Sequence, residues 1–156
     1  MPGPLGRFSH HGDLDAKVEQ LAQIQLFDNV PRRELELLAV HLEEIEVEAG
    51  KTLIHEGHRN DGFWILLEGD VDLSLEGGAQ HHVLGPGSFF GVTSMLDGRP
   101  AIGTVTTATR VRAFVASADQ FRAMRGNPTI LLGLMSAALE RLREDLEILR
   151  VRAAQR

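Results

Sequence analysis

The sequence predicts a mainly β domain, a closed antiparallel roll or sandwich set between helices. Residues 44–49 and 70–76 alternate charged and apolar side chains, as half-buried strands do. Eleven of the 16 glycines lie between residues 50 and 103, a spacing typical of short strands joined by turns. Apolar residues at helical spacing occur only on either side of this region. A chain of 156 residues buries enough surface to hold such a core without a disulfide or a metal.

Two helices are expected before the roll. Residues 1–12, rich in Gly and Pro, predict a flexible tail. Asp13 is the expected N-cap of the first helix, and Pro31 suits the first position of the second. Their apolar faces consist of Leu14, Val18, Leu21, Leu35, Leu38, Leu42 and Ile45.

The strands of the roll follow within a domain predicted over residues 13–127. The continuous apolar run at residues 63–67 predicts a strand that is covered on both faces. Residues 104–109 and 110–115, rich in Thr and Val, supply the last two strands. Phe89, Phe90 and Trp64 are expected in the core rather than as stacking platforms for a ligand.

Helix returns after the last strand. Ser117 and Gln120 have the spacing of a capping box, and Pro128 opens a long helix predicted over residues 128–156. Its apolar residues recur at steps of three and four, which is a heptad seam. The seam consists of Leu132, Met135, Leu139, Leu142, Leu146 and Leu149.

The length of this helix, about 38 Å for 25 residues, exceeds what a small roll covers. The seam therefore predicts a two-fold homodimer. The alternative is that the seam packs against the roll of its own chain. Charged residues avoid the seam, and the spacing predicts the i,i+4 ion pairs Arg141–Asp145 and Arg143–Glu147.

Composition excludes several functions. The chain has no cysteine, which rules out thiolate catalysis, disulfides and zinc–thiolate sites. Its net charge of −6 argues against a generally basic nucleic-acid binder, and the final helix has no basic face, so this chain alone is not expected to bind DNA specifically. No apolar run reaches the ~20 residues of a membrane span, and the N-terminus lacks the apolar core of a signal peptide. We expect no membrane contact and a cytoplasmic location.

Four motifs resemble those of the cyclic nucleotide-binding domain family, the effector domain of catabolite activator proteins and of protein kinase A regulatory subunits. They occur in the family's order and with compatible spacing, over about 110 of the 156 residues. The motifs are LFDNVP at 26–31, AGKTLIHEG at 49–57, FWILLEGDV at 63–71 and LGPGSFFG at 84–91. The resemblance implies an eight-stranded antiparallel jelly roll (double-stranded β-helix), N-terminal helices and a C-terminal dimerisation helix.

The resemblance also implies a phosphate-binding cassette for cAMP or cGMP, and here the cassette is degenerate. In the family, a Glu after Phe-Gly accepts a hydrogen bond from the ribose and an Arg after Pro pairs with the cyclic phosphate. Val92 stands at the Glu position and Ala101 at the Arg position. The candidate ligand-binding residues, all by resemblance, are Phe90, Gly91, Val92, Thr93, Ser94, Arg99, Ala101 and Ile102.

Losing both contacts weakens binding. An enclosed phosphate without a cation and an unpaired ribose hydroxyl together cost about 4–6 kcal/mol, or three to four decades in affinity. Arg99, two residues before the Arg position, either swings to the phosphate or lies solvated at a turn tip. We therefore expect cyclic nucleotide binding to be weakened or altered.

The leading hypothesis is a non-enzymatic regulatory or sensor module that forms a homodimer. The alternative is a pseudo-receptor, a structural or partner-binding module with an unidentified protein partner and no nucleotide ligand. A third reading is a cupin-like metalloenzyme. The chain lacks the His-x-His pattern of cupins, because His55 and His58 flank Glu56-Gly57 instead, and no Gly-x-Ser-x-Gly elbow occurs. We expect neither a metal nor a catalytic residue.

Overall fold

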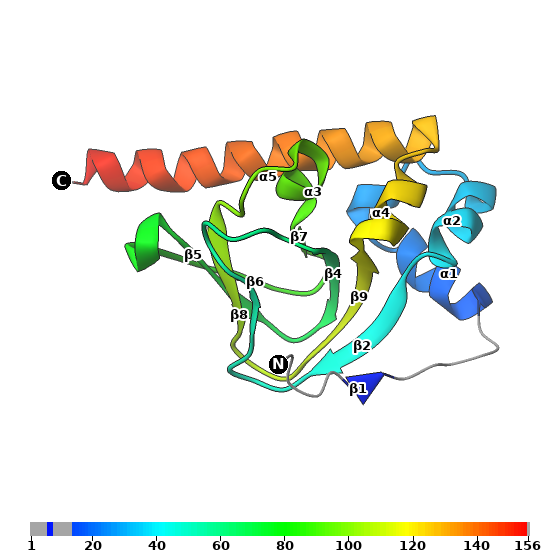
Figure 1. Ribbon diagram of the computed structural model, residues 1–156, viewed down its shortest axis with the longest axis horizontal. Coiled ribbons are helices and arrows are strands. Elements are labelled where there is room, and N and C mark those ends of the chain that lie inside the picture. Colours follow the sequence, from blue (N-terminus) through cyan, green and yellow to red (C-terminus); the bar gives the residue numbers. More distant parts are fainter. Residues whose placement is uncertain (1–5, 8–13, 156) are drawn as a thin grey trace.

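The computed structural model describes residues 6–7 and 14–155 (Figure 1). The first helices are α1 (Leu14–Ala22), η1 (Gln25–Phe27) and α2 (Arg32–Ala39). The strands are β1 (Gly6–Arg7), β2 (Glu43–Val47), β3 (Thr52–Ile54), β4 (Gly62–Glu68), β5 (Val71–Leu75), β6 (Gln80–Leu84), β7 (Phe89–Phe90), β8 (Gly103–Thr107) and β9 (Val111–Ser117). The remaining helices are η2 (Glu76–Gly78), α3 (Val92–Asp97), α4 (Ala118–Met124) and α5 (Pro128–Ala154).

Two antiparallel sheets form the roll. One has the strand order β1-β2-β9-β4-β7 and the other the order β3-β8-β5-β6. The predicted eight-stranded antiparallel roll with flanking helices is confirmed by β2 to β9, and the two-residue strand β1 adds to the edge of one sheet. In Figure 1, α1, α2 and α4 gather at one end of the roll, and α5 runs along one side of it.

Two local predictions need correction. The stripe of the second helix reaches neither Leu42 nor Ile45, because α2 ends at Ala39, Leu42 lies in the connection that follows and Ile45 lies in β2, opposite Ala113. Within the predicted tail, Gly6–Arg7 form a short strand that pairs with Ile45 and Glu46. The other tail residues and the predicted cap Asp13 lie outside the described residues.

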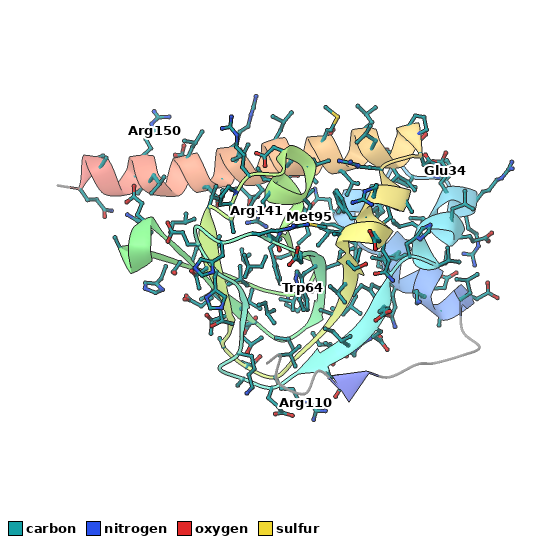
Figure 2. All side chains as sticks on the ribbon, viewed as in Figure 1. Glu34, Trp64, Met95, Arg110, Arg141 and Arg150 are labelled. Atoms are coloured by element: carbon teal, nitrogen blue, oxygen red, sulfur yellow. The ribbon has the colours of Figure 1, made fainter. Side chains whose placement is uncertain are left out.

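Strand β4 separates two hydrophobic cores, which explains its unbroken apolar sequence. Phe63 and Ile65 pack into the core beneath the helices, whereas Trp64 and Leu66 point into the roll. Its partner β9 alternates in the same way. The prediction of a strand covered on both faces is confirmed. Trp64 lies inside the roll (Figure 2), 7% exposed and stacked on Phe90 with ring centroids 6.0 Å apart.

The helix starts after β9 are capped by side chains. Ser117 Oγ accepts a hydrogen bond from the Gln120 backbone N–H, and the Gln120 side chain accepts one from the Ser117 N–H, so the predicted capping box is confirmed. The start of α5 has a cap that we did not predict. Asn127 Oδ1 accepts hydrogen bonds from the N–H groups of Thr129 and Ile130.

The core beneath the helices generates a stability prediction. Phe121 of α4 is 2% exposed, and its ring meets that of Phe63 edge-on at 5.7 Å. Phe121→Ala removes this contact and leaves a cavity, so we expect the free energy of unfolding to fall by about 3–5 kcal/mol. Urea unfolding measures it, with Arg122→Ala on the exposed face of α4 as the control, expected within about 0.5 kcal/mol of wild type. Equal effects of the two substitutions would contradict this packing.

Candidate functional site

The segment from β7 through α3 to β8 forms the predicted cassette. Gly91 joins β7 to α3 with a φ of +88°, a left-handed conformation that strongly favours glycine. A Cβ at this position would lie 2.3 Å from the carbonyl oxygen of Gly62 on β4. The cassette backbone therefore lies directly against β4, and Gly91 permits the contact.

Asn60, which the sequence analysis did not identify, holds the cassette in place. Its Nδ2 donates to the Gly91 carbonyl oxygen at 2.9 Å and lies 3.1 Å from Ser94 Oγ. Its Oδ1 accepts from the Gly62 N–H at 3.0 Å. One side chain thus ties the start of α3 to the start of β4.

A cavity of about 50 Å³ lies between the cassette, the roll and α5. Its lining consists of Ile54, Leu73, Phe90, Gly91, Val92, Thr93, Ser94, Ala101, Ile102, Gly103, Val105, Arg141 and Asp145. Seven of the eight candidate ligand-binding residues are among them. A cavity of this volume has room for a few water molecules or for a small group.

The two substituted cassette positions are both buried. Val92 is 1% exposed and belongs to the core beneath the helices, together with Phe89. Ala101 is 6% exposed and belongs to the core of the roll. Its backbone pairs with the segment before β4, donating to His58 O and accepting from the Gly57 N–H. Apolar side chains therefore occupy the places where the resemblance implies a carboxylate and a guanidinium.

Arg99 is absent from the lining of this cavity. It is exposed and lines a separate concavity between α3 and α4, together with Arg122 of α4 and Arg125, which caps the end of that helix. Its own N–H donates to Asp97 Oδ1. Of the two positions considered for Arg99, the structure shows the solvated one.

The charged groups of the cavity come from α5. Arg141 is 8% exposed and Asp145 6% exposed, and the sequence analysis predicted only that both lie off the seam and pair with each other. Arg141 Nη2 donates to the Phe89 carbonyl oxygen at 3.0 Å, and its guanidinium carbon lies 5.4 Å from the centre of the Phe89 ring. Figure 2 shows Arg141 beneath α5, toward the interior.

The expected ion pairs along α5 are replaced by others. Arg141 Nη1 pairs with Glu144 at 3.1 Å, and Glu147 pairs with Arg150 at 3.8 Å. Among the described residues, no ion pair joins Arg141 to Asp145. A signal for the burial of these two residues exists in the sequence, because they continue an apolar stripe at helical spacing. The buried stripe consists of Ile130, Leu134, Ala137, Ala138, Arg141 and Asp145.

The predicted seam lies on another face of α5. Leu132, Met135, Leu139 and Leu146 are between 49% and 66% exposed, and Leu142 and Leu149 are half-buried. The alternative that the seam packs on its own roll is therefore wrong. The roll instead contacts the stripe that begins at Ile130.

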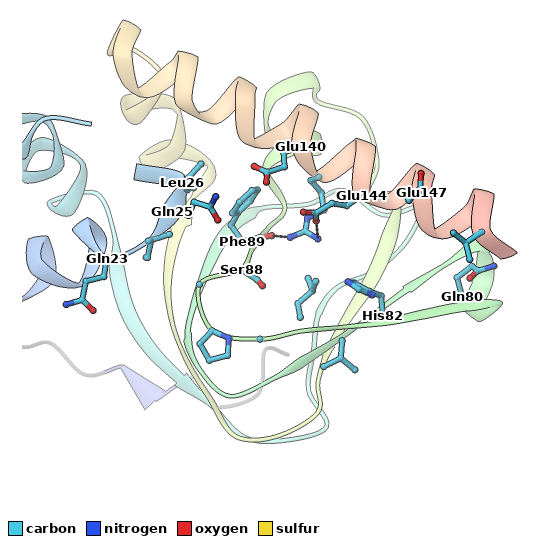
Figure 3. A pocket seen from close by; sticks show the side chains of 18 of the residues that line it. Gln23, Gln25, Leu26, Gln80, His82, Ser88, Phe89, Glu140, Glu144 and Glu147 are labelled. Carbon is cyan, nitrogen blue, oxygen red and sulfur yellow. Dashed lines mark hydrogen bonds and ion pairs between the residues drawn. The ribbon is translucent and has the colours of Figure 1, made fainter. Parts of the chain in front are cut away.

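A larger groove of about 1060 Å³ lies between α5 and β6 (Figure 3). Glu140, Glu144 and Glu147 line it from α5, and Gln80 and His82 line it from β6. Arg141 lines both this groove and the smaller cavity. Within the described residues, no group of three His, Asp or Glu side chains could hold a metal ion, so the cupin-like reading gains no support.

The fold and the cassette can be compared with those of known proteins. A sequence model described as "Cyclic nucleotide-binding domain" matches residues 44–127, more than half of the chain. The chain belongs to the cyclic nucleotide-binding domain family. The predicted resemblance is confirmed, and the match runs from β2 to the residue before α5.

The domain is similar to regulators in bacteria and fungi. It is 28% identical over 130 residues to a CRP-like cAMP-activated global transcriptional regulator of Mycobacterium tuberculosis, covering 80% of this chain and 58% of that protein. It is 29% identical over 112 residues to a cAMP-dependent protein kinase regulatory subunit of Aspergillus niger, covering 68% of this chain and 26% of that protein. The chain thus spans less than two thirds of these relatives.

Solved structures show the same fold. A regulatory subunit of a cAMP-independent protein kinase A from Trypanosoma brucei superposes with a TM-score of 0.70 at 22% identity, covering 84% of this chain and 46% of that one. A cAMP-binding acyltransferase from Mycobacterium smegmatis gives a TM-score of 0.63 at 25% identity, covering 84% and 42%. No helix in the described part of the domain is long and apolar enough to cross a membrane.

The burial of Asp145 generates a pH prediction. Burial raises the pKa of Asp145 above its ordinary 3.8; the nearby Arg141 and His82 lower it, and Glu144 raises it further. The folded state therefore binds this proton more tightly than the unfolded state. The resulting stabilisation is complete below about pH 3.8 and is lost as the pH rises through the raised pKa.

Asp145→Asn removes this titration. We expect the variant to gain stability relative to wild type between pH 4 and pH 7, because only the wild type loses the contribution. Urea unfolding of both proteins at the two pH values measures the difference. A stability difference that stays constant, or that favours wild type more at pH 7, would show that Asp145 is not held in a protonation-favouring site.

Proposed function

We propose that this chain is a non-enzymatic, homodimeric regulatory module whose cassette binds cAMP and cGMP weakly compared with its family. Val92 and Ala101 carry the proposal, because both are buried and apolar where the resemblance implies the ribose and phosphate contacts. A phosphate enclosed there would have no cassette guanidinium, and a ribose hydroxyl would have no carboxylate. The solvated position of Arg99 supports this, since that side chain lies outside the cavity.

The relatives make both behaviours reasonable for this fold. The mycobacterial relative is described as cAMP-activated, whereas the trypanosome regulatory subunit belongs to a kinase described as cAMP-independent. The second candidate function is a module that binds no nucleotide and acts through a protein partner. The cavity volume of about 50 Å³ favours it, since this leaves little room for a nucleotide.

Calorimetric titration with cAMP and then cGMP tests the proposal. We expect wild-type protein to show no saturable binding below the millimolar range. Val92→Glu/Ala101→Arg restores both implied contacts, worth about 4 kcal/mol or roughly a thousandfold in affinity. Saturable micromolar binding by wild type would overturn the proposal.

The double variant needs its own controls, because it places two charges in buried positions. Circular dichroism and thermal unfolding establish that it folds. Thr93→Glu/Ile102→Arg, with the same charges at two neighbouring cassette positions, is the matched control and is expected to gain no affinity. No binding by a folded double variant would favour the module without a nucleotide ligand.

The exposed stripe of α5 supports the dimer. Four large apolar side chains at heptad spacing lie on a face that the roll leaves uncovered, the arrangement by which two helices pair. Within the described residues this stripe continues from Leu132 to Leu149, over more than two heptads. A second copy of α5 with the same stripe is its natural complement.

Sedimentation equilibrium tests the dimer. We expect wild type at tens of micromolar to have twice the 17.2 kDa mass of the chain. Leu139→Glu/Leu146→Glu places four like charges in the paired seam, so this variant is expected to be monomeric. Glu140→Lys/Glu147→Lys changes the residue directly after each of these leucines, about 100° further around the helix, and is expected to remain dimeric. A wild-type monomer, or an equal effect of both variants, would contradict pairing through this stripe.

A further inference from the structure

We propose that α5, and not the cassette, supplies the polar contacts of the cavity, and that the cavity holds the amide-like head group of a small ligand. Such a group presents a carbonyl oxygen to Arg141 and an N–H to Asp145. The inference rests on the proposed function, because it concerns the site in which the cassette contacts are missing. It adds the recognising residues and the chemical class of the ligand.

The first observation is that buried polar atoms around the cavity have no hydrogen-bond partner. Arg141 Nε and Nη1, Asp145 Oδ1 and Thr93 Oγ1 are all buried without one. All three residues line the cavity, and the two charged side chains are more than nine-tenths buried. Leaving a buried donor or acceptor unpaired costs about 1–3 kcal/mol, and more when the group is charged. A ligand that forms hydrogen bonds with these groups removes that cost, and the free energy recovered adds to its affinity.

The second observation is that Arg141 is held in one orientation. Nη2 donates to the Phe89 carbonyl oxygen, Nη1 pairs with Glu144, and the guanidinium lies over the Phe89 ring. Nε has no hydrogen-bond partner, and neither does Nη1 despite its ion pair with Glu144, so both remain as donors for an acceptor oxygen. A donor held in advance loses little conformational entropy when it binds an acceptor.

The charges select a neutral group over an ion. A carboxylate would satisfy Arg141 but would meet the like charge of Asp145, and an ammonium group would meet Arg141. An amide carries an acceptor and a donor side by side without a net charge, so it satisfies both residues and adds no buried charge. The Thr93 hydroxyl can donate or accept, so it suits either end of the group.

The rest of the lining sets the size and character of the ligand. Ile54, Leu73, Phe90, Val92 and Ala101 make the other side of the cavity apolar. About 50 Å³ accommodates a head group of a few non-hydrogen atoms. A carboxamide, urea or lactam with a small apolar substituent meets both conditions.

Acetamide and acetate form a matched pair of probes, since they have the same size and differ in charge and in the N–H donors. Proton–nitrogen NMR of the full chain follows the Nε–H signal of Arg141, assigned by its loss in Arg141→Met. We expect acetamide to shift this signal saturably in the millimolar range and acetate to bind at least tenfold more weakly. Equal binding of the two probes, or no saturable shift with acetamide, would overturn the inference.

Variants of Asp145 identify the second contact. Asp145→Leu removes the acceptor and is expected to weaken acetamide binding at least tenfold, whereas Asp145→Asn keeps an acceptor oxygen and is expected to stay within threefold of wild type. Arg150→Gln, on an exposed part of α5, is the control and is expected to bind like wild type. Unchanged binding by a folded Asp145→Leu variant would overturn the role of Asp145.

The outcomes separate this inference from the proposed function. Acetamide binding together with micromolar cAMP binding would retain the α5 contacts and reject the weakened cassette. Absence of both would reject the α5 contacts and leave the weakened cassette standing. A long-lived water signal at the Arg141 Nε–H that acetamide does not displace would show that bound water satisfies the site, and would also overturn the inference.

Discussion

The two-sided burial of the β4–β9 pair is the constraint on which the other parts depend. Each strand presents alternate side chains to two cores, one inside the roll and one beneath the helices. Neither core is complete without this pair, because Phe63 and Phe114 serve one while Trp64 and Ala113 serve the other. A change in the register of β4 would therefore exchange the two sets of side chains and disrupt both cores.

The candidate site lies where these two cores approach each other. Phe89 and Val92 belong to the core beneath the helices, and Phe90 and Ala101 belong to the core of the roll. Asn60 and Gly91 bind the cassette to the start of β4. The cassette is thus an extension of the packed interior, with Val92 in one core and Ala101 in the other.

Helix α5 has two faces that differ in what they contact. One face contacts the core and the cavity through the stripe that ends in Arg141 and Asp145, and the other presents the exposed heptad. A ligand in the cavity would contact the first face directly. The ligand can shift the helix only if it binds one arrangement of α5 more tightly than another. A regulatory module of this shape would transmit a signal in this way to a partner on the second face.

Local patterns were sufficient for much of the fold. The alternation at residues 70–76, the apolar run at residues 63–67 and the capping box at Ser117 each depend on neighbours in the chain, so the sequence alone determined β5, β4 and the start of α4. The family motifs likewise located the segment from β7 to β8 and the apolar residues Val92 and Ala101 within it. The end of α2 is harder to predict from the sequence, because Ile45 fits both the helical stripe and the strand that pairs with β9.

Only the tertiary structure decided which face of each element meets which neighbour. Charged residues on a helix are normally solvated, yet the approach of α5 to the cassette buries both Arg141 and Asp145. Arg99 lies near the cassette in sequence, but the turn before Pro100 directs it to the far side of α3. The sequence by itself determined the roll, the heptad stripe and the loss of the cassette charges. That Arg141 supplies charge to the cavity depends on its contact with Phe89, about 50 positions away in the chain, and no local sequence pattern predicts such a contact.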